Sequence, residues 1–247
     1  MPELSPVVIG GNGHSGTRVF LEIIGHAGLR CGVPFLTQRR DSEDLRILGL
    51  LNRWARPYLY RELDAEATGR MKQAFARRLR LYFPFRGKPW GFKNPRCMLI
   101  LPVLHELFPD MKFVHVIRDG RDISLGNQFV SRNEYVDAFL EPDESSLPPE
   151  QKMILFWGRS NQRAHEYGKV AMGDRYRLIR WEDLCSDRSR VTADLIRFAG
   201  GDFSAAPGAS RLVRTPGSMG RWQAFPEQVR DPVNHRGAPW LELFGYA

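Results

Sequence analysis

Short hydrophobic runs and amphipathic stretches alternate along most of the chain. The first run, 7–9, is β-branched, and a glycine-rich segment separates it from apolar residues at helical spacing. The run 113–117 has the composition of a buried strand. The pattern predicts strands at 7–9, 113–117 and 176–181, and helices at 19–27, 41–83, 99–108, 123–139, 151–168 and 191–199.

Strands that alternate with helices are typical of a parallel sheet with crossover helices. We therefore expect an α/β fold of three layers: a central parallel sheet with a P-loop-like strand-loop-helix, and helices on both flanks. The length fits one domain over 1–247, with a helical insertion at about 41–89. Residues 141–150 are polar and predict a surface loop, and the tail from Gly200 has little periodicity.

The segment 10–16, Gly-Gly-Asn-Gly-His-Ser-Gly, lies between the first strand and the first helix. Backbone N–H groups of such a loop, at the positive end of a helix, form a cradle for an anion. Glycine permits the tight turn and lets a phosphate approach the backbone. The segment therefore predicts an anion-binding loop.

Three kinds of phosphate loop fit this segment to different degrees. Gly11, Gly13 and Gly16 match the dinucleotide pattern GxGxxG, and Arg39-Arg40 would then suit NADP. The nucleoside-triphosphate pattern fails, because Thr17 and Arg18 stand where it requires lysine and a Mg²⁺-binding hydroxyl. A loop for a phosphosulfate needs the cradle but no metal, and Ser15 and Thr17 would add hydroxyl donors.

The charge balance predicts an anionic partner. The net charge is +8 and the pI about 9.7. The basic residues are spread along the chain without a dense block, so we expect no specific nucleic acid, which leaves an acidic lipid or a multiply charged small molecule. The cysteines Cys31, Cys97 and Cys185 are far apart, so no metal site is expected. No apolar run reaches the ~18 residues of a membrane span, and no leader pattern opens the chain, so we expect a cytoplasmic protein.

Several motifs resemble those of the PAPS-dependent sulfotransferases of bacterial type, where PAPS is 3′-phosphoadenosine 5′-phosphosulfate. Residues 13–17, Gly-His-Ser-Gly-Thr, resemble the family's phosphosulfate loop R/K-S-G-T-T, with His14 at the basic position and Arg18 at the second threonine. The block 90–122 resembles the family more closely. It contains Trp90, Lys93-Asn94-Pro95, Phe108-Pro109-Asp110, the strand 113–117, and Arg118-Asp119-Gly120-Arg121-Asp122.

Two later elements extend the resemblance to residue 222. They are Arg180-Trp181-Glu182-Asp183-Leu184, which we interpret as structural, and Gly220-Arg221-Trp222. The resemblance implies that Arg118 binds the 3′-phosphate of PAPS, and that Arg221, with Arg211 or Arg214, lies near the 3′-phosphate or the adenine. Gly126 stands where the family has a serine, so Asn127 or a neighbouring N–H is expected in its place. The implied cofactor-binding residues are Gly11, Asn12, Gly13, His14, Ser15, Gly16, Thr17, Arg18, Arg118, Asn127 and Arg221.

The resemblance also implies the chemistry. Sulfuryl transfer to a hydroxyl or amine is an in-line reaction that needs a donor at the leaving oxygen and a base for the acceptor proton. Lys93 is the first candidate donor, before His14 and Arg18. Asp41 is the candidate base, although it could equally cap the following helix. Other candidate bases are Asp44, Glu43 and His105.

Two other functions stay open at this point. An NADP-dependent oxidoreductase would explain GxGxxG and Arg39-Arg40, and a non-catalytic nucleotide- or polyanion-binding module would explain the charge. Neither explains Lys-x-Pro together with Arg-Asp-x-Arg-Asp. For a sulfotransferase, the expected acceptor is a small molecule, a carbohydrate or a lipid-linked group.

Overall fold

The computed structural model describes residues 5–31, 37–38, 43–79, 89–126 and 135–247. Its main sheet has five strands in the order β2-β5-β1-β6-β7, and every neighbouring pair is parallel. This confirms the expected α/β fold. The strands are β1 (Val7–Gly11), β2 (Arg30–Cys31), β5 (Trp90–Lys93), β6 (Lys112–Ile117) and β7 (Tyr176–Arg180), with β3 (Thr37–Gln38) and β4 (Glu43–Asp44) forming a separate antiparallel pair.

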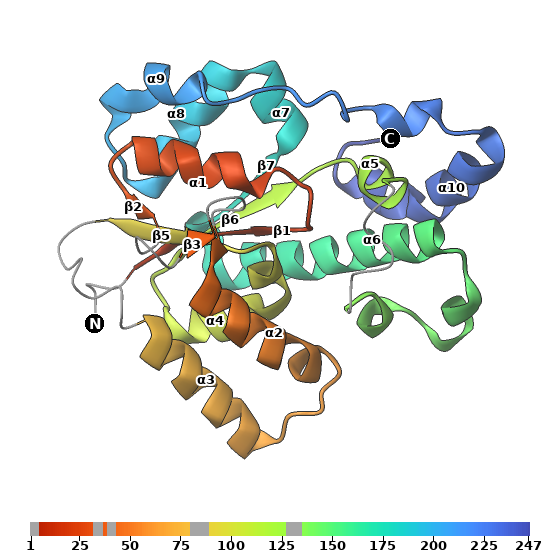
Figure 1. Cartoon of the computed structure of the whole chain (residues 1–247), viewed down its shortest axis with the longest axis horizontal. Coiled ribbons are helices and arrows are strands. Elements are labelled where there is room, and N and C mark those ends of the chain that lie inside the picture. The colour runs from red at the N-terminus through yellow and green to blue at the C-terminus, as the bar shows by residue number, and fades with distance from the viewer. Residues whose placement is uncertain (1–4, 32–36, 39–42, 80–88, 127–134) are drawn as a thin grey trace.

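Helices cover both faces of the sheet and give three layers (Figure 1). On one face lie α1, α7, α8 and α9, and on the other α2, α3, α4, α6 and the 3-10 helix η2. The helices are α1 (Thr17–His26), α2 (Leu45–Leu59), α3 (Ala65–Leu79), η2 (Pro95–Ile100), α4 (Leu101–Leu107), α5 (Gly120–Ser124), α6 (Pro149–Tyr167), α7 (Trp181–Ser186), α8 (Arg188–Ala199), α9 (Ala206–Ser210) and α10 (Glu227–Leu243).

The alternation of side chains along β1 divides the hydrophobic core in two. Val7 and Ile9 pack with α1 and α8, whereas Val8 faces η2 and α4. All three side chains are buried, as expected for a central parallel strand with helices on both faces. The strand therefore holds the start of the glycine-rich loop rigidly in the middle of the sheet.

The strand order brings distant motifs to one edge. β1 pairs with β5 on one side and with β6 on the other, and all three run parallel. The carboxyl ends of the three strands therefore lie side by side. The glycine-rich loop follows β1, Lys93 is the last residue of β5, and Arg118 follows β6. A dinucleotide-binding fold of strand order 3-2-1-4-5-6 would place its second strand beside the first. Here β2 lies at the sheet edge beside β5, so the topology does not support the oxidoreductase hypothesis.

Several elements differ from those that the sequence pattern predicts. The predicted helix over 41–83 is two helices, α2 and α3, separated at 60–64. The helix predicted after Arg118–Asp122 ends at Ser124. The strand β5 was not predicted, because four residues beside a proline show no clear period. One domain over 1–247 stays a prediction.

The largest difference is α10, a 17-residue helix in the part of the chain where little structure was expected. Pro232, Pro239 and Gly237 made this segment look like a loop. Its buried residues Val233, Gly237 and Leu241 recur every four positions and face α6. A Cβ on Gly237 would collide with Ile154 of α6, so the glycine serves close helix packing. In the described chain no helix is long and apolar enough to cross a membrane.

Candidate functional site

The glycine-rich loop leaves β1 at Gly11 and enters α1 at Thr17. His14 and Gly16 both have left-handed backbones, with φ of 66° and 82°, and Ser15 N donates to Asn12 O at 3.2 Å. Left-handed residues that alternate with ordinary ones turn successive N–H groups toward one side and form an anion-binding nest. The nest lies at the N-terminus of α1, whose partial positive charge also favours an anion.

Trp181, the first residue of α7, covers this loop. A Cβ on Gly16 would collide with its ring, so only glycine lets the indole approach so closely. Trp181 is buried, and its indole N–H has no hydrogen-bond partner among the described residues. Sequence analysis treated this tryptophan as structural, but it also lines the cavity described next.

A cavity of about 1190 Å³ opens at the carboxyl edge of β5, β1 and β6. Its lining includes the glycine-rich loop, Trp181, Arg118 and residues 212, 214 and 216. It also includes the apolar and aromatic side chains of Leu48, Leu99, Tyr135 and Phe156. The lining thus combines a polar cradle with an apolar wall, as ligand sites usually do.

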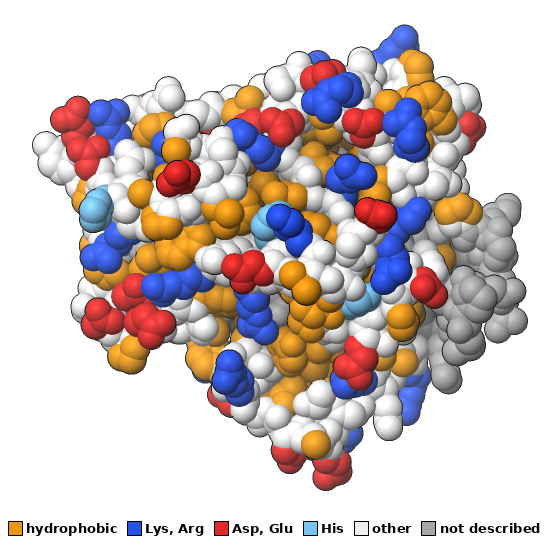
Figure 2. Space-filling view, turned by 180° about the vertical axis from the view of Figure 1, so that it is seen from behind, with side chains coloured by type: hydrophobic (Ala, Val, Ile, Leu, Met, Phe, Trp, Pro, Cys, Tyr) orange, Lys and Arg blue, Asp and Glu red, His pale blue; other side chains and the backbone are white. Residues whose placement is uncertain are grey.

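The cavity lining is strongly cationic. Among the described residues it includes one carboxylate, Glu22, against the side chains of Arg18, Lys93, Arg96, Arg118 and Arg214. On the face of the molecule seen in Figure 2, basic and acidic side chains are interspersed without a continuous basic patch. The cavity therefore concentrates positive charge around its ligand, as an anion site requires.

Lys93 ends β5 beside the glycine-rich loop. It is 5% exposed and pairs in register with Ile9 of β1. The next residue, Asn94, accepts from Arg96 N at 3.0 Å and so caps η2, while its buried Nδ2 has no described partner. Lys93 and Asn94 thus place an ammonium group and a free amide donor at the cavity.

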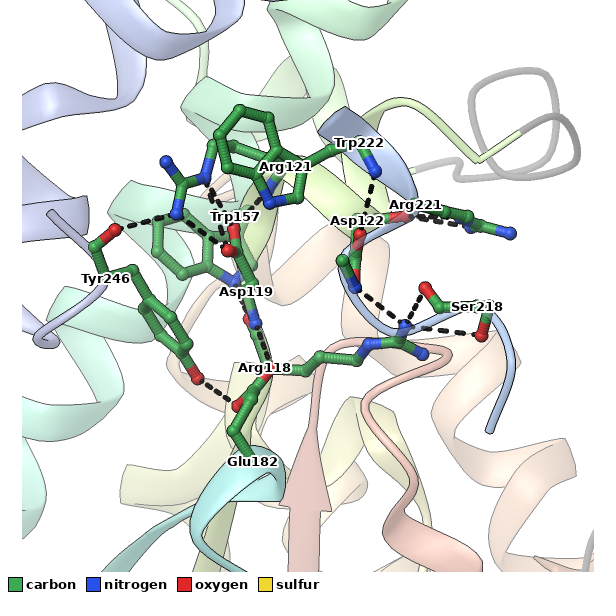
Figure 3. Close-up of polar contacts among 11 residues, drawn as sticks. Arg118, Asp119, Arg121, Asp122, Trp157, Glu182, Ser218, Arg221, Trp222 and Tyr246 are labelled. Atoms are coloured by element: carbon green, nitrogen blue, oxygen red, sulfur yellow. Dashed lines mark hydrogen bonds and ion pairs between the residues drawn. The ribbon is translucent and has the colours of Figure 1, made fainter. Parts of the chain in front are cut away.

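Arg118 directly follows β6 and is fixed on one side only (Figure 3). Its Nη2 donates to Asp122 Oδ2 at 2.9 Å and to Ser218 O at 2.5 Å. Its Nε is buried and has no partner among the described residues, and the side chain lines the cavity. A buried guanidinium N–H without a partner is costly unless a ligand accepts from it. Arg118 is therefore suited to bind an anion.

Asp122 connects the Arg118 turn to a segment one hundred residues later (Figure 3). Besides Arg118, its carboxylate accepts from Gly220 N at 2.8 Å and Trp222 N at 3.1 Å. Arg221 donates to the carbonyl of Asp122 at 2.8 Å, and its guanidinium occupies the space that a Cβ on Gly126 would need. A side chain at position 126 would therefore displace the end of the Arg221 side chain from its present position.

A second cluster of polar side chains also contacts this turn (Figure 3). Glu182 accepts from Asp119 N at 3.0 Å and from the Tyr246 hydroxyl at 2.8 Å, as a structural role predicts. Arg121 pairs with Asp119 and donates to Tyr246 O at 2.7 Å. Burial raises the pKa of Glu182, so the Tyr246 hydroxyl and Asp119 N–H are needed to stabilise its charged form.

The structure brings most of the predicted residues together. The cavity is lined by Gly11, Asn12, Gly13, His14, Gly16, Thr17, Arg18, Lys93 and Arg118. Ser15 is buried in the loop, and its hydroxyl has no described partner. Arg214 lines the cavity, but Arg211 and Arg221 do not. His105 bonds to the Tyr167 hydroxyl at 3.0 Å outside the lining, whereas Asp41, Asn127 and Arg39-Arg40 lie outside the described residues.

Sequence analysis missed Glu22, Asn94, Arg96 and Trp181 as cavity residues. Glu22 follows Arg18 by one helical turn, which is the only sequence signal that could have identified it. Arg96 hydrogen-bonds Asn52 and lies 5.1 Å from the ring of Tyr135. No group of three metal-binding side chains occurs within the described ranges.

Comparisons with known proteins agree with this geometry. The profile of the sulfotransferase family matches residues 6–205. Sulfotransferase STF9 from Mycobacterium avium superposes with a TM-score of 0.59 at 13% identity, over 100% of this chain and 78% of that one. Sulfotransferase STF1 from Mycobacterium tuberculosis superposes with a TM-score of 0.56 at 16% identity, over 95% of this chain and 76% of that one. The sulfotransferase domain of the Synechococcus olefin synthase superposes with a TM-score of 0.53 at 16% identity, over 98% of this chain and 94% of that one. No curated protein matches significantly.

Proposed function

The chain belongs to the sulfotransferase family, and we propose that it transfers a sulfuryl group from PAPS to a hydroxyl or amine of an acceptor. The observation that carries the choice of donor is the pairing of two anion sites at one sheet edge. The nest at 12–17 suits a 5′-phosphosulfate, and Arg118, with its unpartnered Nε, suits a 3′-phosphate. Trp181, which lies against Gly16 and lines the same cavity, offers an aromatic surface for the adenosine.

In this proposal the chain's residues position the reactants and stabilise charge. The bond between sulfur and the bridging oxygen breaks while a bond from the acceptor oxygen or nitrogen to sulfur forms. Lys93 stabilises the negative charge on the leaving oxygen, with His14 and Arg18 as further donors. The acceptor's proton passes to a base, for which Asp41 is our candidate and Glu22 is a second candidate within the described cavity.

The acceptor would contact the apolar side chains of the cavity lining. Leu48, Leu99, Tyr135 and Phe156 supply surface for an apolar body. Small-molecule and lipid-linked acceptors fit this wall better than a bare carbohydrate, which needs more polar groups. We also propose a cytoplasmic location, because Cys31, Cys97 and Cys185 are free thiols.

Ligand-induced stabilisation tests the choice of donor. Adenosine 3′,5′-bisphosphate, the by-product of PAPS, should raise the melting temperature in EDTA, because the site uses no metal. At a hundredfold excess over its Kd a ligand that binds only the native state adds ~2.7 kcal/mol. NADPH and Mg-ATP should have much smaller effects. Stabilisation by NADPH without any effect of the bisphosphate would refute the proposal.

A further inference from the structure

Helix α6 carries a row of polar side chains that face the sheet. Trp157, Ser160 and Asn161 are buried, and His165 follows one turn later. Trp157 Nε1 donates to the carbonyl of Arg118 at 3.0 Å, and the Asn161 side chain donates to Asn12 Oδ1 at 2.5 Å. Adjacent turns of one helix are thus bonded to both anion-binding segments.

The contacts form one hydrogen-bonded chain through the core. His165 Nδ1 lies 3.1 Å from the Tyr176 hydroxyl, which lies 2.6 Å from His115 Nδ1. His115 Nε2 lies 2.9 Å from Asn161 Oδ1. Asn12 completes the chain, because its Nδ2 lies 3.3 Å from Ser160 Oγ.

The direction of every bond follows from the carbonyl of Trp157, which can only accept. Asn161 Nδ2 donates to it at 2.7 Å, so Asn161 Oδ1 must accept from His115 Nε2. His115 Nδ1 then accepts from the Tyr176 hydroxyl, whose oxygen accepts from His165. Burial lowers the pKa of His115 to about 4, in agreement with the neutral ring that this pattern needs.

A buried hydrogen-bonded network stabilises a core less readily than apolar side chains do, because each of its polar groups needs a hydrogen-bond partner. It ends on Asn12, inside a segment that is otherwise short of side chains. Glycine loses more conformational freedom on ordering than any other residue, so a loop with glycines at 10, 11, 13 and 16 needs an anchor to hold its nest ready. Asn12 can provide it, because its buried amide is bonded to Asn161 and Ser160 of α6.

We propose that Asn161 is a positioning residue for the donor's 5′ end: through Asn12 it holds the glycine-rich loop in the conformation that binds a phosphate. This inference rests on the proposed function. It makes α6 the common support of both anion sites, since Trp157 fixes the Arg118 turn and Asn161 fixes the loop. Asn161 itself does not touch the ligand.

Two ligands that differ only at the 5′ position test the inference. Asn161→Ala should weaken binding of adenosine 3′,5′-bisphosphate about tenfold, and binding of adenosine 3′-monophosphate less than about twofold. The reason is that only the bisphosphate uses the loop. Tyr176→Phe is the matched control, because it removes a hydroxyl of the same hydrogen-bonded network that bonds to His115 and His165 and not to Asn161 or Asn12. It should lower the melting temperature and leave the ratio of the two affinities unchanged.

The conservative variant His115→Gln should keep the wild-type ratio, because the glutamine amide can donate to Asn161 as Nε2 does. If Asn161→Ala does not fold, Ser160→Ala removes the other Asn12 contact and should shift the ratio in the same direction. Equal losses for both ligands, or an unchanged ratio, would overturn the inference. A wild-type protein that binds neither ligand would instead overturn the proposed function.

Discussion

At the scale of single residues, Asp122 organises the 3′-phosphate site that we propose. Its carboxylate accepts from one side of Arg118 and from two backbone N–H groups of the segment 220–222, so it is buried yet fully bonded. Arg118 keeps Nε for a ligand because Asp122 and Ser218 occupy Nη2. Arg118, which would bind the anion, and Asp122, which orients Arg118, are thus four positions apart. Asp122 lies on α5 and Arg118 lies just before it.

Replacing Arg118 should affect one phosphate selectively. Arg118→Ala removes a charge-assisted hydrogen bond worth ~1.5–3 kcal/mol, so the Kd of adenosine 3′,5′-bisphosphate should rise at least about tenfold. Adenosine 5′-phosphosulfate, which lacks the 3′ group, should bind almost as before. Calorimetric titration of both ligands measures this, and parallel losses would indicate a folding defect.

Lys93 should matter for turnover more than for binding. If it stabilises charge that develops on the leaving oxygen, its interaction is strongest in the transition state. Lys93→Ala should then lower kcat by ~10²–10³ and change the bisphosphate Kd only a few-fold. Single-turnover kinetics with PAPS separate the two effects, and an unchanged rate would assign Lys93 to another role.

The base is tested by comparing two carboxylates. Asp41→Asn should lower kcat most for the least acidic acceptors, which depend most on proton removal. Glu22→Gln is the comparison, because Glu22 is a carboxylate of the described lining. A loss in the Glu22 variant alone would transfer the role to Glu22. A lower melting temperature with full activity would leave Asp41 as a helix cap.

At the scale of elements, α6 connects the proposed site to the core through Trp157 and Asn161. The network that α6 forms with His115 and Tyr176 should also make the stability of the protein depend on pH. Between pH 6.5 and 4 the unfolded chain protonates His115, whereas burial keeps the native ring neutral. The unfolded state therefore binds more protons in this window, and stability present above pH 6.5 is lost as the pH falls. The pKa values of His105 and His165 are lowered too and act in the same direction.

Urea denaturation at two pH values measures the contribution of His115. When the pH is lowered from 7.5 to 5, protonation of His115 in the unfolded state should reduce the unfolding free energy of the wild type by about 2 kcal/mol. His115→Gln cannot be protonated, so this variant should lose correspondingly less over the same range. Identical losses in both proteins would show that His115 is not the titrating group.

Elements with a clear period were predictable from sequence, and those defined by tertiary contact were not. The strands β1 and β6 were found because each is a continuous run of buried apolar residues, and the long α6 because its apolar residues recur at helical spacing. β5 is only four residues long, and α10 contains two prolines that α6 packing tolerates. Local propensity cannot reveal a helix whose stability comes from its partner.

At the scale of the whole molecule, sheet topology assembles the site. Three motifs separated by up to a hundred residues meet because β5, β1 and β6 are parallel neighbours. Sequence could indicate the glycine-rich loop and Arg118, because each follows a predicted strand, and Lys93, because it stands in the Lys-x-Pro motif. It could not indicate Glu22, Arg96 or Trp181, whose place in the cavity depends on how helices pack over that edge.

The central claim is that one cavity binds both phosphates of a 3′-phosphorylated nucleotide. A crystal structure with adenosine 3′,5′-bisphosphate, grown in EDTA, tests it most directly. We predict the 5′-phosphate within about 3 Å of N–H groups in the loop 12–17, and the 3′-phosphate at a similar distance from Arg118 Nε. A bisphosphate bound with its 3′-phosphate away from Arg118, or outside this cavity, would contradict the account.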